Sequence, residues 1–272
     1  MRQPSPPADD QDIVAARNLG AYLHPGITRW YAALSGLTPA EEVVLADSRA
    51  HWADRDVLDI GIGGGRTTAV LAPDARRYVG IDFSISMIAA AKASLPGLDL
   101  RRADARRMPM FRDGAFDFVL FSFNGLDSVN DASRAVIMAE VTRVLKPGGA
   151  FVFSGHNLDW TGKGGFLADM FRVKISSSPL KTAKAIGRVG VRIRNWLRNQ
   201  KAAVRTDRYA VMTDPGNDFA SPHYYAGAAE TRRQVEAAGL ELVNVYDGEG
   251  KITADAAERA SSTLYYLTRK PL

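Results

Sequence analysis

Short apolar runs alternate with stretches of helical periodicity through the middle of the chain. The apolar runs lie near residues 56–60, 77–81, 98–101, 117–122 and 149–155. The helical stretches lie near 66–72, 84–94 and 132–145, and a helix near 227–238 precedes closing strands near 240–247 and 263–269. Strands that alternate with helices are typical of a mostly parallel sheet with helices packed on it. The pattern therefore predicts an α/β domain with a seven-stranded sheet flanked by helices.

Three segments fall outside this alternation. Residues 12–52 are predicted to form an N-terminal helical cap over the carboxyl ends of the strands. Its apolar contacts are expected from Tyr22, Leu23, Ile27, Trp30, Tyr31 and Leu34. Residues 158–222 form an insertion after the fifth strand, and loops of that length are often lids. Residues 1–11, rich in proline and acid, are predicted to be a disordered tail, which leaves 53–157 and 223–272 as the core.

Part of the insertion has the periodicity of an amphipathic helix. One face carries Ile186, Val189, Ile193 and Trp196, and the opposite face carries Lys181, Lys184, Arg188 and Arg192. Residues 163–208 hold 12 lysines and arginines against two acids, a net charge of +10, whereas the rest of the chain carries 23 basic and 28 acidic residues. The basicity is therefore local.

Local basic charge is evidence about partners more than about fold. The segment could be a solvated helical face, or it could bind an anionic acceptor, an acidic partner protein, a membrane surface or nucleic acid. Its apolar stripe could equally pack on the core as a lid. The sequence leaves these alternatives open.

Composition excludes several classes of chemistry. The chain has no cysteine, which excludes disulfides, zinc–cysteine sites and cysteine nucleophiles. No metal-ligand cluster is apparent. The amino terminus lacks the apolar core of a secretory signal, and no apolar stretch is long enough to span a bilayer. A cytoplasmic enzyme is the expectation.

A glycine-rich turn follows the first predicted strand. Residues 57–68 read VLDIGIGGGRTT, so an apolar run ends at Asp59 and is followed by Gly61, Gly63 and Gly65 before a helix starts. A strand, a tight turn and a helix are the usual site for a nucleotide-like ligand. Arg66 stands where a dinucleotide fingerprint has its third glycine, and the carboxylate of Asp59 would repel a pyrophosphate. The turn therefore favours a ligand with a cationic group.

The second predicted strand also ends in a carboxylate. Asp82 follows Asp59 by 23 positions, the spacing at which an acidic residue accepts hydrogen bonds from ribose hydroxyls. Its competing role is to cap the following helix together with Ser84. The spacing favours ribose binding.

With these two segments, the chain resembles the class I S-adenosylmethionine-dependent methyltransferases. The likeness continues through residues 103–109 (ADARRMP), 116–124 (FDFVLFSFN) and 145–149 (LKPGG). It implies a Rossmann-like sheet and S-adenosylmethionine as cofactor, with Asp59 near its cationic amino-acid end and Asp104 near the adenine amino group. The implied cofactor-binding residues are Asp59, Gly61, Gly63, Gly65, Asp82, Phe83, Met87, Asp104, Ala105, Ser122 and Asn124.

Histidines near the implied site could act as general bases, since imidazole titrates near neutral pH. His156 follows the fifth strand, and His223 follows the insertion, whereas His24 and His51 have no partner visible in the sequence. For His156 and for His223, a structural or surface role is an equally good prediction. Acceptor-binding candidates are Tyr22, Tyr31, Asn124, His156, Tyr224 and Tyr225.

The leading hypothesis is methyl transfer to an oxygen or nitrogen of a small molecule, with secondary metabolism as one setting. The alternatives are a macromolecular (RNA or protein) methyltransferase that docks through residues 163–208, and a non-catalytic cofactor-binding module. The fourth strand is followed by Phe123-Asn124-Gly125-Leu126, which lacks the Asn/Asp-Pro-Pro-aromatic motif of enzymes that methylate exocyclic base amines. The oligomeric state is not predicted.

Overall fold

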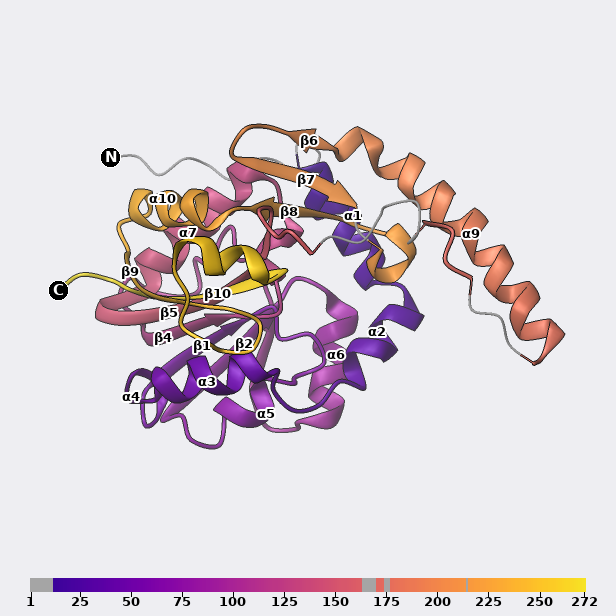
Figure 1. Cartoon of the computed structure of the whole chain (residues 1–272). Helices are drawn as coiled ribbons and strands as arrows, with labels where there is room; N and C mark the ends of the chain where they lie inside the picture. The colour runs from indigo at the N-terminus through magenta and orange to yellow at the C-terminus, as the bar shows by residue number, and fades with distance from the viewer. Residues whose placement is uncertain (1–11, 163–169, 174–176, 214) are drawn as a thin grey trace.

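The protein is an α/β structure in which helices cover both faces of a twisted sheet (Figure 1). The computed structural model describes residues 12–162, 170–173, 177–213 and 215–272, so the predicted disordered tail lies outside the described residues. The strands are β1 (Asp56–Ile60), β2 (Arg77–Asp82), β3 (Asp99–Arg102), β4 (Phe116–Phe121), β5 (Leu145–Asn157), β6 (Val204–Arg205), β7 (Tyr209–Thr213), β8 (Pro222–Ala226), β9 (Glu241–Tyr246) and β10 (Thr263–Arg269). The mostly parallel, helix-flanked sheet predicted from the sequence is confirmed.

The sheet has ten strands where the sequence predicted seven. Its main order is β3-β2-β1-β4-β5-β8-β7-β6, and β10 pairs antiparallel with both β5 and β9. The three additional strands come from the segment around residues 204–226, which the sequence analysis divided between the insertion and the core. Their pairing with β5 depends on contacts between distant parts of the chain, which local periodicity does not report.

Strand β8 pairs with the part of β5 that extends beyond the end of β4. Residues 150–153 of β5 pair with β4 and β10 at once, whereas His156 pairs with both β10 and β8. Because a strand has two edges, β4 and β8 must share one of them. The hairpin of β7 and β8 therefore continues the sheet beyond the carboxyl end of β4, on the side where α/β sheets bind ligands.

Helices pack on both faces of the sheet, and α9 (Pro179–Asn199) lies at the periphery (Figure 1). They are α1 (Ile13–Tyr22), α2 (Pro25–Ala32), α3 (Pro39–Asp47), α4 (Arg49–Trp52), α5 (Thr68–Leu71), α6 (Ile85–Ser94), α7 (Asp131–Val144), α9 (Pro179–Asn199) and α10 (Ala228–Ala237), with 3-10 turns η1 (Gly125–Ser128), η2 (Gln200–Ala202), η3 (Gly216–Phe219) and η4 (Asp255–Ala260). One apolar cluster packs α7 and α10 on one face of the sheet. A second cluster packs α3 to α6 on the other face.

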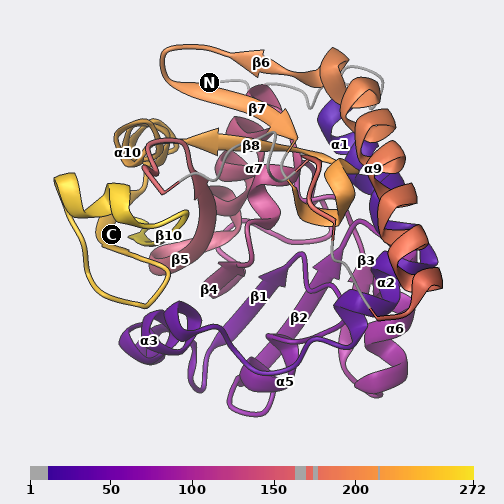
Figure 2. The ribbon, with the colours of Figure 1, turned by 45° about the vertical axis from the view of Figure 1, so that its right-hand side comes forward.

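The helix predicted in the insertion is confirmed as α9, a 21-residue helix. It lies at the periphery of the molecule, on the side of α1 and α2, in both views (Figures 1 and 2). A small apolar cluster of Val14, Ala202, Val211, Tyr224 and Ala226 joins α1 to the β7–β8 hairpin that follows α9. In the described part of the chain, no helix is long and apolar enough to cross a membrane.

Candidate active site

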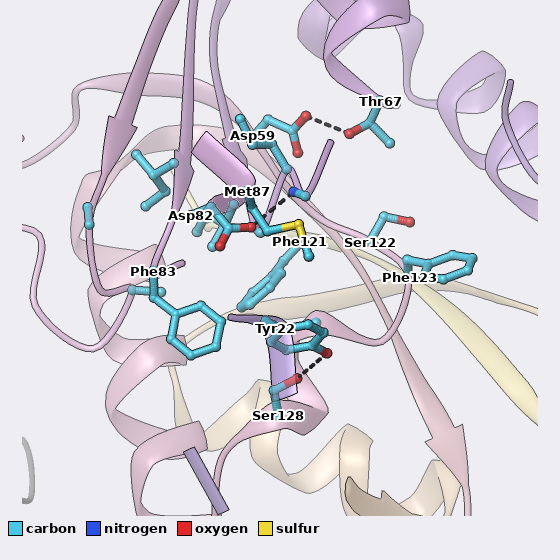
Figure 3. Close-up of a pocket in the computed structure, with 18 of the residues that line it drawn as sticks. Tyr22, Asp59, Thr67, Asp82, Phe83, Met87, Phe121, Ser122, Phe123 and Ser128 are labelled. Carbon is cyan, nitrogen blue, oxygen red and sulfur yellow. Dashed lines mark hydrogen bonds between the residues drawn. The ribbon is translucent and has the colours of Figure 1, made fainter. Parts of the chain in front are cut away.

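A pocket opens at the carboxyl ends of β1, β2 and β4 (Figure 3). Its empty volume is about 1040 Å³, part of which is open to solvent. The glycine-rich turn forms one wall, and Tyr22 of α1, Tyr31 of α2 and Leu34 of the following loop form another. The pocket therefore lies where the two acidic strand ends converge.

The glycines of the turn let the backbone bend and let α2 approach. Gly61 and Gly63 have positive φ angles of 69° and 54°, a region that side chains disfavour. A Cβ atom on Gly64 would lie 2.5 Å from the Cα atom of Ala32 in α2. Helix α2 therefore covers the turn closely, although none of its own residues is buried.

Asp59 is a buried carboxylate at the pocket wall. Its Oδ2 accepts hydrogen bonds from the Thr67 hydroxyl and the Tyr78 hydroxyl, both at 2.7 Å. Burial raises the pKa of Asp59 to about 7, although these two hydrogen bonds oppose the shift. A cationic group bound beside Asp59 would favour its ionised form, so the residue suits the cationic ligand predicted from the sequence.

Asp82 links the glycine-rich turn to the start of α6. Its Oδ2 accepts a hydrogen bond from the Gly63 N–H at 3.0 Å, and its Oδ1 accepts one from the Ser84 N–H at 2.8 Å. Burial raises the pKa of Asp82 to about 6, against the effect of both hydrogen bonds. A carboxylate accepts about four hydrogen bonds, so Asp82 has capacity for the hydroxyl groups of a ligand.

Asp104 lines the pocket and is paired with an arginine. Arg106 donates from Nη2 to Asp104 Oδ2 at 2.6 Å and from Nε to both carboxylate oxygens. The side chain of Asp104 is nevertheless 43% exposed. The predicted contact of Asp104 with an adenine amino group would therefore form beside this ion pair.

Arg66, which stands where a dinucleotide fingerprint has its third glycine, joins the turn to α3. Its guanidinium donates two hydrogen bonds to the buried carboxylate of Glu41, and the Ser122 hydroxyl donates to the same carboxylate. Burial alone would raise the pKa of Glu41, but the hydrogen bonds and charge of Arg66 hold it below its usual value. The guanidinium carbon also lies 4.9 Å from the ring centre of Phe123.

Aromatic side chains form a connected wall around the pocket. The Tyr22 ring meets those of Tyr31 and Phe83 edge to face, with ring centres 5.5 Å and 5.8 Å apart. Phe123 extends the wall from Tyr31, and Phe121 lines the pocket between the strand ends (Figure 3). Tyr22 is held by a 3.3 Å hydrogen bond with the Ser128 hydroxyl. This wall suits a flat apolar ligand.

The backbone after β4 is strained where it meets the pocket. Phe123 and Asn124 have φ angles of 54° and 58°, which are uncommon for residues other than glycine. The Asn124 N–H donates to the Ser154 hydroxyl at 2.8 Å, which holds this turn against β5. Strain of this kind is concentrated at functional sites, and Phe123 lines the pocket.

A buried ion pair fixes His156 at the end of β5. Asp127 Oδ2 lies 2.8 Å from His156 Nδ1 and accepts the His156 backbone N–H, while Asp127 Oδ1 accepts from Arg134 Nη1 at 2.6 Å. Asp127 and Arg134 are both 1% exposed. The His156 ring contacts the His223 and Tyr225 rings, at 5.2 Å and 4.7 Å between centres. Asp127 therefore orients the imidazole.

The structure brings most of the predicted site residues to one pocket. Those that line it are Asp59, Gly61, Gly63, Asp82, Phe83, Met87, Asp104, Ala105, Ser122, Tyr22 and Tyr31. Gly65, Asn124, His156, His223, Tyr224 and Tyr225 are not among its lining residues. Tyr224 lies in the apolar cluster under the β7–β8 hairpin and donates to Asp131 Oδ1 at 2.7 Å.

Other functional contacts were not predicted. Glu41 and Ser128 reach the site through tertiary packing, so nothing near them in the sequence marks them. Tyr78 lies four residues before Asp82 in β2, and its hydroxyl donates to Asp59 Oδ2. Asp127 directly follows residues 123–126 after the fourth strand, so an acid next to this segment could have been predicted from the sequence.

Comparison with known proteins assigns the central segment to a family. Residues 57–149 match the family model described as a methyltransferase domain. The chain therefore contains a class I S-adenosylmethionine-dependent methyltransferase domain, and S-adenosylmethionine is the cofactor of that class. The resemblance inferred from the sequence is confirmed.

Curated relatives match over this domain. A demethylmenaquinone methyltransferase of Beutenbergia cavernae is 34% identical over 144 residues, which are 52% of this chain and 58% of that protein. Another of Mycolicibacterium vanbaalenii is 41% identical over 97 residues, 35% of this chain and 40% of that protein. A probable S-adenosylmethionine-dependent methyltransferase of Mycolicibacterium smegmatis is 34% identical over 116 residues, 43% of this chain and 44% of that protein. The chain thus spans at most 58% of the length of these relatives.

Solved structures share the fold over most of the chain. A Burkholderia thailandensis 1,6-didemethyltoxoflavin-N1-methyltransferase with bound 1,6-didemethyltoxoflavin and S-adenosylhomocysteine has a TM-score of 0.57 at 14% identity, over 95% of this chain and 88% of that chain. The CcbJ methyltransferase of Streptomyces caelestis has a TM-score of 0.56 at 19% identity, over 90% and 96%. At these identities the likeness establishes the fold.

Proposed function

We propose that this protein transfers the methyl group of S-adenosylmethionine to an oxygen or nitrogen atom of a small aromatic acceptor. The main support for this proposal is that an aromatic wall and two buried acids line the same pocket. The wall consists of Tyr22, Tyr31, Phe83 and Phe123, and the acids are Asp59 and Asp82. The acids suit the cationic and ribose parts of the cofactor, and the wall suits a planar ring. A setting in secondary metabolism is part of the same proposal.

The residues present fit the cofactor of this class. The glycine-rich turn allows close approach of a ligand, and the high pKa of Asp59 indicates a carboxylate that gains from a cationic neighbour. When bound, the cofactor supplies a methyl carbon activated by its positively charged sulfur. The chain would then exclude water with its aromatic wall and hold the acceptor in line, and orientation of this kind contributes about 7–11 kcal/mol.

A general base adds a smaller factor if the acceptor must lose a proton, about 10²–10⁴ in rate. His156 is the base we propose, because Asp127 fixes its Nδ1 and directs Nε2 away from that carboxylate. The register of β4 and β5 pairs Phe121 with Phe153, which brings Asn124 and His156 to the same level at the carboxyl ends of the strands. Phe123, the neighbour of Asn124, lines the pocket, so His156 would lie at the rim of the pocket.

Isothermal titration with S-adenosylmethionine tests the cofactor site. We expect Asp82→Ala to abolish measurable binding, because the substitution removes the acceptor for ribose hydroxyls and frees the glycine-rich turn. Asp74→Ala, which removes an exposed carboxylate paired with Arg49, is the matched control. Unchanged affinity in Asp82→Ala would overturn this assignment.

Turnover is tested with methyl-labelled S-adenosylmethionine and a panel of phenols, aromatic amines and demethylmenaquinone, the acceptor in the relatives' name. Label in an acceptor, with equal release of S-adenosylhomocysteine, supports the proposal. RNA and peptide acceptors belong in the same panel, because label in either would favour the macromolecular alternative. Binding without turnover on the whole panel would favour a non-catalytic module.

The role of His156 is tested by His156→Gln with His223→Gln beside it. We expect His156→Gln to lower kcat with a hydroxyl acceptor by about 10²–10⁴. The affinity for the cofactor should not change. An unaltered kcat would show that His156 is not the base.

A further inference from the structure

Helix α9 exposes an apolar stripe bordered by positive charge. Ile186, Ile193 and Leu197 lie at positions i, i+7 and i+11, on one face of the helix, and are 58%, 36% and 58% exposed. Arg194 and Arg198 are exposed and directly follow Ile193 and Leu197, so they border this stripe. We call Ile186, Ile193, Leu197, Arg194 and Arg198 the α9 stripe.

The body of the protein covers only one border of the apolar face. Arg192 packs inward, with its Nε donating to Asp218 Oδ1 at 2.9 Å, and Asn195 and Asn199 donate to the backbone oxygens of Asp218 and Phe219. Val189 and Trp196, predicted to share a face with Ile186 and Ile193, are half-buried. The helix is therefore anchored by polar contacts along one edge, and much of its apolar face remains in solvent.

The charge of α9 is not neutralised by its own sequence. The helix carries six lysines and arginines and no acid, and like charges one turn apart destabilise a helix. Asp218 pairs with Arg188 and Arg192, while the described residues show no ion pair for Lys184, Arg194 or Arg198. Arg17 of α1 lies near Arg198, which adds a further positive charge. An anionic partner would relieve this repulsion.

From this arrangement we propose that the α9 stripe docks on the surface of a membrane that contains anionic lipids. Aliphatic side chains would enter the boundary between headgroups and acyl chains, and the flanking cations would meet lipid phosphates, the combination that defines interfacial helices. Twenty-one residues are enough to span a bilayer, but six cations prevent it, so the helix would lie in the plane.

Other occupants fit less well. Nucleic acid would match the charge, but its phosphates gain nothing from an aliphatic stripe. A second copy of this chain would cover the stripe, but it would bring two helices of six cations each together without an acid between them. Of these occupants, only a lipid surface would contact both the aliphatic side chains and the arginines of the α9 stripe.

The test uses the full chain and vesicles of two compositions, phosphatidylcholine alone and phosphatidylcholine with phosphatidylglycerol. We expect sedimentation only with the anionic vesicles, and weaker binding as salt rises. Arg194→Gln/Arg198→Gln should weaken binding roughly 30-fold, at ~5-fold for each cation. Ile186→Ser/Leu197→Ser should weaken it at least about tenfold, from lost burial of the two aliphatic side chains.

Matched controls are Arg55→Gln/Arg112→Gln for charge and Val243→Ser/Ile252→Ser for exposed apolar area. Circular dichroism checks that each variant keeps its helices. Equal losses in the controls, or no binding to anionic vesicles at low salt, would overturn the proposal. Retention by RNA or by an acidic protein without vesicle binding would also overturn it.

Insertion of the stripe is measured separately with a single label. The chain has no cysteine, so Leu197→Cys provides a unique site for an environment-sensitive fluorophore. We expect its emission to shift to the blue on anionic vesicles, while a label at Val243→Cys should not shift. Binding without a shift at position 197 would mean purely electrostatic attachment and would overturn insertion of the stripe.

Discussion

Arg66 Nη2 donates a hydrogen bond to Glu41 Oε1 at 2.7 Å, and this contact ties the glycine-rich turn to helix α3. Arg66 Nη1 donates to the other oxygen of the same carboxylate, so the pair is bidentate. The Glu41 side chain is fully buried, and Ser122 at the end of β4 also donates to it. One carboxylate thus fixes three elements that border the pocket.

Breaking this pair should destabilise the protein. Glu41→Gln leaves the mostly buried guanidinium without its counter-charge, and removal of one partner from a buried pair costs about 3–5 kcal/mol. Urea unfolding measures the loss. The double variant Glu41→Gln/Arg66→Gln should lose less than the sum of the single variants, because the two residues are in contact. Additive losses would contradict the coupling.

Cofactor binding should weaken as pH falls through about 7. The pKa of Asp59 is near 7 in the folded, ligand-free protein, and a cationic ligand group favours the ionised form, so binding would release a proton. The Kd should therefore rise by up to about tenfold per pH unit below 7. Titration calorimetry between pH 5.5 and 8.5, set by that pKa, measures this slope. The Asp59→Asn variant should bind the cofactor weakly, and its Kd should depend less on pH.

The same residue should affect stability in the opposite direction. Burial raises the pKa of folded Asp59 above its ordinary value, so the folded state holds this proton more tightly than the unfolded state does. The stability contributed by the protonated group is complete below the unfolded pKa of about 3.9 and is lost as pH rises through about 7. Ligand-free Asp59→Asn should therefore melt higher than the parent protein at pH above that value. A lower melting temperature there would argue against the raised pKa.

Gly64→Ala should separate α2 from the turn. The new Cβ would lie 2.5 Å from the Cα atom of Ala32, a distance that requires the backbone to move. We expect at least a tenfold loss of cofactor affinity, about 1.4 kcal/mol, with little change in global stability because α2 buries no residue. Gly20→Ala in α1 is the control, since nothing lies within 4 Å of its Cβ. Similar effects of both variants would indicate a general response of the cap.

Tyr224→Phe should cost stability without affecting the reaction. The hydroxyl donates to Asp131 Oδ1 at 2.7 Å and accepts from Gln234 Nε2 at 2.8 Å, and loss of each such hydrogen bond costs about 1 kcal/mol. Thermal unfolding measures that loss, and KM for the acceptor should not change. A raised KM would return Tyr224 to the acceptor-binding role predicted from the sequence.

The core of the fold was predictable because its signals are local. Strands β1, β2, β4 and β5 each contain a short apolar run, the glycine-rich turn follows β1 and Asp82 ends β2, so position along the chain indicated their place in the fold. The β7–β8 hairpin was missed because it is defined by pairing with β5. Its alternating burial also separates Tyr224 from Tyr225, since neighbours in a strand face opposite sides.

The candidate site was predictable where single residues carry the chemistry. Asp59 and Asp82 line the pocket as the spacing indicated. Glu41 could not be identified, because its partner Arg66 is brought to it by the packing of α3 on the sheet. The faces of α9 were correct as a pattern, but the sequence could not tell that Asp218 would draw Arg192 inward and leave Ile186 in solvent.

Helix α2 covers the glycine-rich turn without burying a residue, whereas the β7–β8 hairpin is hydrogen-bonded into the sheet. Local opening is easiest where little apolar surface must be exposed. The pocket is therefore expected to open at α2 and not at the hydrogen-bonded sheet. Ligands would enter and leave when α2 lifts, so exchange of its amide hydrogens should slow once the cofactor is bound.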